Sequence, residues 1–416
     1  MAKNNSQKNI PDGWLTINLD KLATISRGGS PRPIESYITD NQDGLNWLRI
    51  GDINPGAKYI YGTSQKIRKE GLSKTTLVNS GDFILSNSMS FGRPYIMKIS
   101  ACIHDGWLAL RKIKTDLISK EFLYYLLSSK KIQNEFISIS AGSGVQNLKK
   151  DTVSTVAVKI PLVAEQERIV SVLESWDHAI EKLAKKIKVK KNIKKRLMQD
   201  LLTGKIRLAG FKDEWKTFKL NDVGKTYAGI MGKDKDDFGS GKPFITYMNI
   251  YSSSVINPDK CGRVKIDDGE NQNKAKYGDL FFTTSSETPE EVGVSSVLLD
   301  KNVSDLYLNS FCFGFRLNNF KTLSPEFAQF YFRGQVFRKQ MTRIAQGASR
   351  YNLSKKYFLD TTIKIPSDIK EQNAIADIFK IADKEIEELN KKLLILKDQK
   401  KYLLNNLITG SIRTKS

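Results

Sequence analysis

Two stretches of the chain, residues 165–207 and 371–413, align without a gap at an offset of 206 and share 18 of 43 residues. Each begins with Glu-Gln and ends with Thr-Gly-x-Ile-Arg, and a strand-like segment containing Ile-Pro precedes each one. This duplication constrains the fold more than any other feature, because whatever one copy forms the other must form too. We therefore expect two equivalent units.

The repeat continues faintly outside these stretches. Short matches recur in the same order at offsets between 197 and 205, so the elements persist while insertions fall in the loops. Elsewhere the two halves differ strongly. The matched segments are Trp14 with Trp215, Gly81-Asp82 with Gly278-Asp279, Glu121-Phe122 with Glu326-Phe327, and Asn147-Leu148 with Asn352-Leu353.

The repeat boundaries predict four segments: a globular unit at 1–160, a helix at 161–207, a second globular unit at 208–366 and a second helix at 367–416. The globular segments alternate short β-prone runs, such as 83–85, with turn signals and an aromatic amphipathic helix. They indicate a mixed α and β structure, and the strand pairing stays open.

Both long helices carry an apolar seam. A sustained period of 3.5 residues is typical of a coiled coil. Lys190, Lys194 and Lys400 interrupt the seam, so packing is expected to loosen there. Gly204 and Gly410 stand where a helix C-cap needs a left-handed residue. The seam residues are Ile169, Leu173, Trp176, Ile180, Leu183, Ile187, Leu197, Leu201, Ile375, Phe379, Ile386, Leu389, Leu393, Leu396, Leu403 and Leu407.

The duplication favours a pseudo-twofold arrangement. The first helix leaves the first globular unit and ends at the second, and symmetry would return the end of the second helix to the first unit. The predicted fold is therefore α+β, with two globular units joined by two long helices that form an antiparallel coiled coil.

The 416 residues carry a formal net charge of +22. A basic surface attracts phosphates, which indicates a polyanionic partner, although solubility alone would also explain the charge. Cys102, Cys261 and Cys312 form no CxxC pair and only two histidines accompany them, so no zinc site is expected. Neither a secretory signal nor a membrane-spanning apolar run is found, and we expect a cytoplasmic protein with no membrane partner.

Recognisable catalytic motifs are missing from the sequence. It contains no phosphate-binding P-loop, nucleophile elbow, zinc-protease helix or Asn/Asp-Pro-Pro-aromatic tetrapeptide of adenine methyltransferases. His104-Asp105 could form a base with its orienting carboxylate, but an ordinary pair beside a strand is the simpler interpretation. Glu287, Glu290 and Glu291 could bind a metal, but a solvated acidic loop is simpler. The sequence predicts no catalytic and no metal site.

Basic and amide side chains gather with Gly, Ser and aromatic residues in several predicted loops. Arg can bond guanine, Asn and Gln can bond adenine, and Lys and Ser suit phosphates. Solvated surface turns are the alternative for each loop. Equivalent positions in the two halves favour DNA contact around Asn147 and Asn352. The candidate DNA-binding residues are Arg27, Ser30, Arg32, Arg93, Gln146, Asn147, Lys149, Lys150, Arg350, Tyr351, Asn352, Lys355 and Lys356.

Residues 182–196 of the first helix hold nine basic side chains in fifteen. A helix that tracks DNA is one interpretation. Most of the excess charge nevertheless belongs to the globular segments. We interpret these lysines mainly as a solvated face, which could lie over a duplex between the two units, and expect no base contacts from them.

With these features the chain resembles the specificity subunits of type I restriction–modification systems over nearly its full length. The resemblance rests on the doubled Ile-Pro and Glu-Gln entry, the heptad helix and the Leu-Leu/Ile-Thr-Gly-x-Ile-Arg exit. Weaker marks are Gly28-Gly29-Ser30-Pro31, residues 47–53 and Ser285-Ser286-Glu287-Thr288.

The resemblance implies two target-recognition domains, each reading half of a split double-stranded DNA site. The helices would form the spacer and dock two methyltransferase subunits, which would bind S-adenosylmethionine and methylate adenine N6. Restriction or motor subunits would add cleavage of unmethylated DNA, and this chain would bind no cofactor. Val145-Gln146 in the first unit and Arg350-Tyr351 in the second differ, which implies different half-sites.

A stand-alone DNA-binding regulator or scaffold that oligomerises through the coiled coil is the main alternative. It would bind no methyltransferase, so the stoichiometry of the purified complex discriminates the two. A hidden enzyme is a third possibility, which an assay of the isolated chain for nuclease or methyltransferase activity would test.

Overall fold

The computed structural model describes residues 11–54, 56–87, 92–140 and 147–414. The residue Gln146, one of the candidates, lies outside the described residues.

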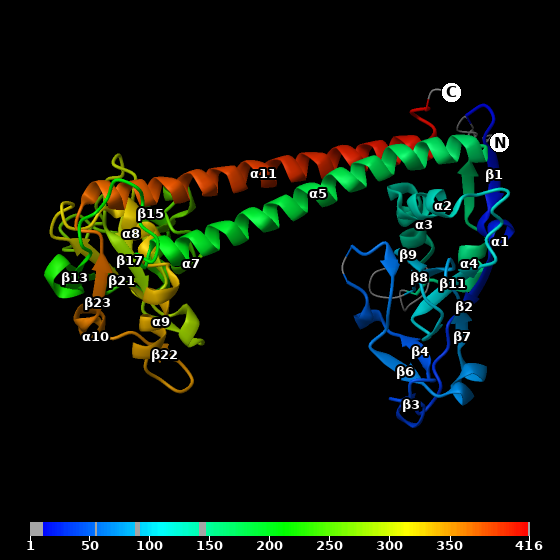
Figure 1. Ribbon diagram of the computed structural model, residues 1–416, viewed down its shortest axis with the longest axis horizontal. Helices are drawn as coiled ribbons and strands as arrows, with labels where there is room; N and C mark the ends of the chain where they lie inside the picture. The colour runs from blue at the N-terminus through cyan, green and yellow to red at the C-terminus, as the bar shows by residue number, and fades with distance from the viewer. Residues whose placement is uncertain (1–10, 55, 88–91, 141–146, 415–416) are drawn as a thin grey trace. The chain divides into compact units, whose positions relative to one another are not determined.

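The chain divides into two compact units (Figure 1). Unit 1 comprises Met1–Leu183 and Lys392–Ser416, and unit 2 comprises Ala184–Lys391. Two long helices, α5 (Val163–Leu201) and α11 (Ile369–Thr409), each contribute one portion to either unit. Each unit is therefore a globular part packed on one end of both helices. The division into four segments at 160, 207 and 366 remains a prediction.

The described residues of unit 1 form one strand pair and two five-stranded sheets. The pair is β1 (Leu15–Asn18) with β12 (Ala157–Ile160), antiparallel. One sheet has the spatial order β2 (Thr24–Arg27), β11 (Trp107–Arg111), β8 (Phe83–Ser86), β9 (Pro94–Met97) and β5 (Tyr59–Ile60). The other has the order β3 (Ile38–Thr39), β6 (Gln65–Ile67), β4 (Leu45–Leu48), β10 (Ala101–Ile103) and β7 (Thr76–Val78).

The two larger helices of unit 1, α2 (Lys120–Ser128) and α3 (Lys130–Ser140), lie between its core sheet and the long helices (Figure 1). The side chain of Ser119 accepts a hydrogen bond from the amide of Phe122 at 3.1 Å, which caps the first of the two larger ones. The smaller helices are α1 (Leu19–Leu22) and α4 (Lys150–Ser154), with 3-10 turns η1 (Ile34–Ser36), η2 (Ile50–Asp52) and η3 (Lys69–Lys74).

Unit 2 repeats this plan with smaller sheets. Its strand pairs are β13 (Lys216–Lys219) with β23 (Thr362–Ile365), and β18 (Ser285–Ser286) with β22 (Tyr351–Asn352). One sheet has the order β14 (Gly224–Ala228), β21 (Cys312–Leu317), β17 (Leu280–Thr283) and β19 (Ser295–Val297). The other has the order β16 (Gly262–Val264), β15 (Phe238–Ile245) and β20 (Tyr307–Leu308).

Four of the helices of unit 2 recur in the order of those of unit 1, and the one at Tyr247–Ser252 has no α-helical counterpart among the described residues of unit 1. The helices of unit 2 are α6 (Leu220–Val223), α7 (Tyr247–Ser252), α8 (Pro325–Tyr331), α9 (Gln335–Ile344) and α10 (Lys355–Asp360), with 3-10 turns η4 (Lys235–Asp237), η5 (Pro258–Lys260) and η6 (Pro289–Glu291).

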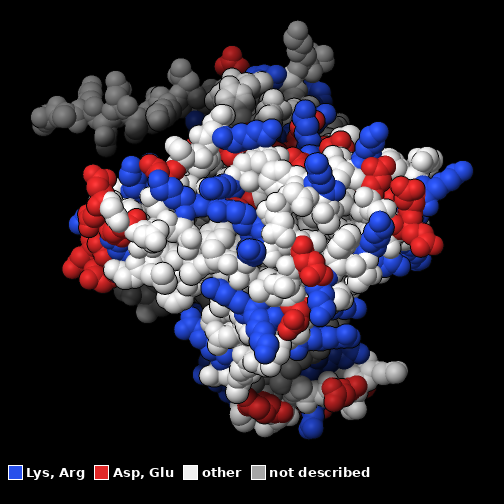
Figure 2. Space-filling model, turned by 90° about the vertical axis from the view of Figure 1, so that its left-hand side faces the viewer, with Lys and Arg blue, Asp and Glu red and all other residues white. Residues whose placement is uncertain are grey.

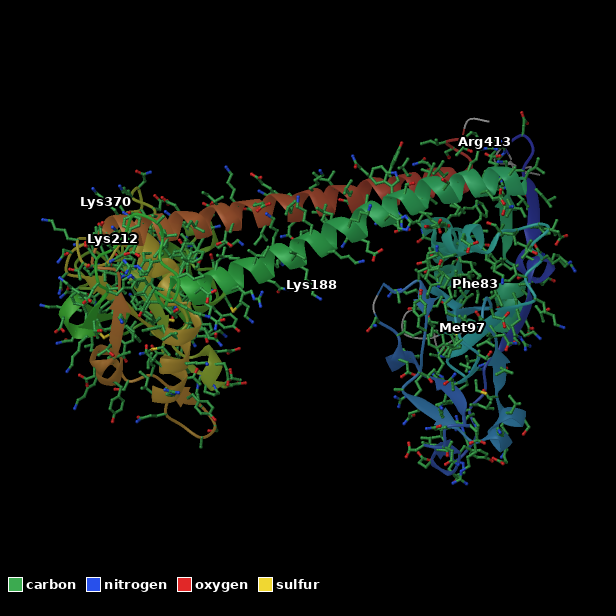
Figure 3. The ribbon with its side chains drawn as sticks, viewed as in Figure 1. Phe83, Met97, Lys188, Lys212, Lys370 and Arg413 are labelled. Carbon is green, nitrogen blue, oxygen red and sulfur yellow. The ribbon has the colours of Figure 1, made fainter. Side chains whose placement is uncertain are left out.

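The core of each unit includes the ends of both long helices. In unit 1, Leu173 of α5 and Leu407 of α11 belong to the cluster that contains Phe83, which lies inside the unit (Figure 3). In unit 2, Leu201 of α5 and Phe379 of α11 join a core rich in phenylalanine. Burying such side chains contributes about 1.5–3 kcal/mol each, so the helix ends are integral parts of the units.

Within each unit the two helices run antiparallel. In unit 1 the carboxylate of Asp177 on α5 pairs with Lys400 on α11, and in unit 2 Lys194 pairs with Asp383. The predicted seam residues are all buried or half-buried. The seam lysines are half-buried and ion-paired, and Lys190 likewise pairs with a glutamate of α11. The looser packing expected around these lysines remains a prediction.

A glutamine near the start of each long helix bonds to the segments on either side of it. The side-chain oxygen of Gln166 accepts from the amide of Ser119 at 2.8 Å, and its amide donates to the carbonyl of Pro161 at 2.8 Å. Gln372 makes the same bonds in unit 2, with Ser324 and Pro366. One glutamine in each repeat thus ties a long helix to the globular part beside it.

The glycine expected at each helix end adopts the predicted left-handed conformation. Gly204 has φ of +69° and Gly410 has φ of +73°. A Cβ on Gly204 would lie 3.3 Å from the ring of Trp215, and one on Gly410 would lie 3.3 Å from Trp14. Close approach to a tryptophan therefore adds a second reason for glycine at both positions.

Candidate nucleic-acid interface

In unit 1 the loops that join β2, β11, β8 and β9 to the rest of the chain meet at one end of their sheet. Because neighbouring strands are antiparallel, the ends of β2 and β8 lie beside the starts of β11 and β9. The register pairs Arg27 with Leu108 and Ser86 with Trp107 at this end. The loops that carry the predicted DNA-binding residues of unit 1 leave from these positions or bond to them.

Asp105 is the centre of this end of the sheet. Its carboxylate accepts a hydrogen bond from the Ser30 hydroxyl at 2.7 Å and lies 3.9 Å from a guanidinium nitrogen of Arg32. Its main-chain carbonyl accepts from Arg27 at 3.2 Å and from Asn87 at 2.7 Å. The hydrogen bond from Ser30 is the main cause that lowers the pKa of Asp105, so the carboxylate is ionised at neutral pH. Three residues singled out in the sequence therefore converge on one aspartate.

A groove of about 830 Å³ opens beside this cluster. Its walls combine aromatic, basic, amide and carboxylate groups, which is the mixture that base edges and phosphates require. The lining residues are Ser30, Pro31, Arg32, Pro33, Ile34, Glu35, Ile38, Trp47, Arg49, Gln65, His104 and Asp105.

Arg49 and Gln65 in this groove were not singled out from the sequence. A guanidinium nitrogen of Arg49 donates to the hydroxyl of Ser64 at 2.7 Å and lies 3.6 Å from the carboxylate of Asp52. The arginine is thus oriented while its side chain stays 44% exposed. The sequence signal that points to Arg49 is the 47–53 segment, which is otherwise only a weak mark of the family resemblance. Parallel pairing of β4 with β10 sets it beside His104, and such pairing cannot be read from one sequence.

His104 is a neutral member of the groove. Its Nδ1 accepts a hydrogen bond from the amide of Gly106 at 2.7 Å, so the proton resides on Nε2. Burial is the main cause that lowers the pKa of His104, which keeps the ring uncharged at neutral pH. The 3.6 Å approach of its Nδ1 to Asp105 is therefore not an ion pair. Asp105 does not orient this ring as a catalytic carboxylate would, and Nε2 is available as a hydrogen-bond donor.

The other candidates of unit 1 attach to the same place. The main chain of Arg93 bonds to Ser86, and the amide next to Asn147, that of Leu148, donates to the carbonyl of Asn87 at 3.0 Å. Arg93 is exposed and Asn147 half-buried. Lys149 and Lys150 are exposed at the start of α4.

In unit 2 the candidate loop attaches at the equivalent place. Asn352 pairs with Ser285 across β22 and β18, and the amide of Leu353 donates to the carbonyl of Thr284, just after β17, at 2.8 Å. Arg350 is exposed in the tight turn that a bridge between Gln346 and Asn352 closes, and Tyr351 is half-buried. Lys355 and Lys356 are exposed in the first turn of α10. The candidate residues of unit 2 therefore flank one sheet end.

The chemistry of the sheet end differs between the units. Gly229 and Ile230 follow β14 as Gly28 and Gly29 follow β2, but exposed apolar side chains take the place of the polar cluster. These are Met231, Met248 and Phe311, at 62%, 60% and 63% exposure. The two sheet ends therefore share a backbone arrangement and differ in side-chain chemistry.

Figure 2 shows Lys and Arg side chains scattered over the face of unit 2 turned to the viewer, with acidic side chains mostly at its left and right margins and a few near its centre. In the part of the chain that the structure describes, no group of three or more His, Cys, Asp or Glu could hold a metal ion. No described helix is both long enough and apolar enough to cross a membrane.

Comparison with known proteins identifies the family. The chain matches the family "Type I restriction modification DNA specificity domain" over residues 11–191 and 212–397. It belongs to this family. The two matches correspond to the two units of the duplication.

Relatives align with this specificity subunit over nearly the whole chain. The MjaVIII specificity subunit of Methanocaldococcus jannaschii is 24% identical over 98% of this chain and 95% of its own length. The HsdS subunit of Thermoanaerobacter tengcongensis has a TM-score of 0.55 at 17% identity, over 98% of this chain and 99% of that one. A chain from a structure of type I restriction–modification assembly has a TM-score of 0.64 at 15% identity, over 97% and 100%.

Family membership confirms the α+β fold and makes this chain a DNA specificity subunit of a type I restriction–modification system. Such subunits are non-catalytic, and the catalytic activity resides in other subunits of the complex. Membership does not favour the alternative of a stand-alone regulator. DNA and other subunits of the system are therefore its partners.

Proposed function

We propose that the two units read the two halves of a bipartite double-stranded DNA site, each with the loops at one end of its core sheet. The convergence of Arg27, Ser30 and Arg32 on Asp105 carries this proposal for unit 1. Arginines held by carboxylates and hydroxyls are pre-oriented donors for guanine edges or phosphates. In unit 2 the turn at Arg350 supports it, because this turn attaches beside Thr284 at the matching end of the core sheet.

The units would read different sequences. The groove of unit 1 offers charged and amide groups, whereas unit 2 offers Met231, Met248 and Phe311 beside its basic turn. Apolar side chains discriminate by contact with thymine methyl groups or by insertion between base steps. An asymmetric bipartite site is the expected result.

The long helices would dock two methyltransferase subunits, one for each repeat. Several apolar side chains of α11 point away from the seam, among them Ile381, Leu394 and Ile395 at 70%, 62% and 56% exposure. Apolar groups exposed in this way are typical of surfaces that a protein partner covers. The methyltransferases would hold S-adenosylmethionine, and restriction or motor subunits would join this assembly.

Co-expression with the methyltransferase subunit tests this function. The purified complex should have a mass that fits one specificity chain with two methyltransferase chains. It should protect two short DNA segments separated by an unprotected or less protected gap. A complex without methyltransferase that still binds its DNA with full affinity would instead support the stand-alone regulator.

A further inference from the structure

A basic pocket of about 440 Å³ lies in unit 2 between α5 and the start of α9. Five of its lining side chains are cations, and among the described residues no carboxylate lines it. A concave site lined by one sign of charge concentrates the potential that attracts an anion. The five cations are Lys191, Lys194, Lys195, Arg333 and Arg338.

The two arginines have no carboxylate partner within the described part of the chain. Arg333 donates to main-chain carbonyls, such as that of Ser295 at 2.6 Å, and Arg338 donates to that of Val292 at 2.6 Å. Carbonyl oxygens satisfy hydrogen bonds but leave the positive charge uncompensated. Nη1 of Arg338 is buried without a described hydrogen-bond partner. Burial lowers the pKa of both arginines to about 10, so both stay charged at neutral pH.

Main-chain amides add to this charge. Helix α9 begins at Gln335 after Gly334, which offers no capping side chain, and both residues line the pocket. No described side chain accepts from the Gln335 amide. In unit 1 the equivalent amide, that of Lys130, is capped by the side-chain oxygen of Asn405 at 2.9 Å. The start of a ten-residue helix is thus left open to an anion in unit 2 only.

The same place in unit 1 lacks the two arginines. An alignment of α8 and α9 with α2 and α3 sets Ser128 opposite Arg333 and Gln133 opposite Arg338. Gln133 bonds to main-chain carbonyls, including that of Leu127 at 2.7 Å. Unit 2 therefore differs from unit 1 at Arg333, at Arg338 and at the uncapped amide of Gln335. Each difference adds or exposes positive charge.

We propose that this pocket binds a phosphate group of the DNA backbone, outside the bases that the units read. The inference rests on the proposed function. Lys191 and Lys195 are exposed at the pocket and make no described ion pair, whereas Lys194 is held by Asp383. A phosphate seated between these two lysines, Arg338 and the open amides would fix the position of the duplex without reading its sequence. An acidic segment of a partner protein is the competing occupant.

A salt titration of DNA binding tests the pocket in the intact complex with the methyltransferase. The double variant Lys191→Gln/Lys195→Gln is compared with the matched control Lys397→Gln/Lys401→Gln, which changes the equivalent residues of α11. The pocket variant should lower the slope of log Kd against log salt by about one to two and weaken binding about tenfold at low salt. The control should keep the slope of the unchanged complex. Equal slopes for all three complexes would overturn the inference.

Neutral backbone substitutions identify the occupant. Single methylphosphonates are placed along the duplex, one phosphate at a time. The unchanged complex should lose affinity at a position outside the half-sites, and the pocket variant should lose none there. The same loss in both complexes contradicts the inference, as does release of methyltransferase from the pocket variant, which would identify an acidic protein segment. An unchanged complex that binds no duplex overturns the proposed function and this inference with it.

Discussion

Arg413, at the end of the second repeat, donates two hydrogen bonds to Glu165, at the start of the first, at 2.6 and 2.8 Å. Figure 3 shows Arg413 at the end of α11. Arg207 makes the same pair with Glu371, at 2.6 and 2.7 Å. Residues 206 positions apart in the chain thus play identical roles, and the exit of each repeat closes on the entry of the other.

Two of the identical positions of the repeat, Glu165/Glu371 and Arg207/Arg413, form the two bidentate ion pairs. Two more form the seam pairs of Asp177 with Lys400 and of Asp383 with Lys194. A polar contact inside an apolar seam fixes register and direction at a cost in stability. The helix sequences are therefore similar because each must fit the other in antiparallel register. The globular loops have no such partner and are free to diverge.

Glu371→Gln should destabilise unit 2. The side chain of Glu371 is 1% exposed, and loss of its charge leaves Arg207 without a counter-ion. We expect a loss of about 2–3 kcal/mol in the free energy of unfolding. Urea denaturation measures it, with Glu387→Gln as the control, because that glutamate pairs with Lys391 at 65% exposure and should matter little. Equal midpoints for the two variants would show that the pair is not structural.

Lys400 and Asp177 should be energetically coupled. Lys400→Met and Asp177→Asn should each destabilise unit 1, and the double variant should cost less than their sum by about 1 kcal/mol, because the second change removes a charge that already lacks its partner. Thermal unfolding of the unchanged chain and the three variants gives the free energies for this double-mutant cycle. Strict additivity would mean that the two side chains do not interact.

Arg32→Ala should relax base preference in one half of the DNA site, and Arg350→Ala should relax it in the other. Loss of one bidentate arginine costs about 1–3 kcal/mol of discrimination. Binding to a library of randomised duplexes measures preference at every position. Each variant is the control for the other, and an effect of both on the same half would contradict a two-unit reader.

Insertion of one heptad after Leu183 in α5 and after Lys391 in α11 should lengthen the tolerated gap between half-sites. These points separate the two compact units, so contacts within each unit remain intact. Seven residues add about 10 Å of helix, equivalent to at most about three base pairs. Selection from duplexes with graded gaps measures the result, and an unchanged gap would show that the helices do not set the spacing.

The two long helices and the duplicated units could be predicted from the sequence, because the patterns that indicate them are local or repeated. The heptads place residues such as Leu173 and Leu407 in the core, and the duplication indicates that the second helix returns to unit 1. The ion pairs of the seam lysines do not follow from the heptad pattern. Their acidic partners are remote in sequence, Asp383 lying 189 residues from Lys194.

The candidate interface was only partly predictable. Arg27, Ser30 and Arg32 stood out as a basic loop next to glycines, but Asp105, which organises them, looked like half of an ordinary pair. Arg49 reaches the groove through parallel strand pairing, which depends on the whole fold. Contacts between distant segments, unlike periodicity, leave no trace in a single sequence.

Sequencing the methylated bases of a host that expresses this chain with its methyltransferase tests the central claim most directly. We expect adenine N6 methylation at one bipartite motif, with two different short half-sites at a fixed separation. Arg32→Ala should change the bases of one half and leave the gap and the other half unaltered. A single continuous motif, or a change in both halves, would contradict the account.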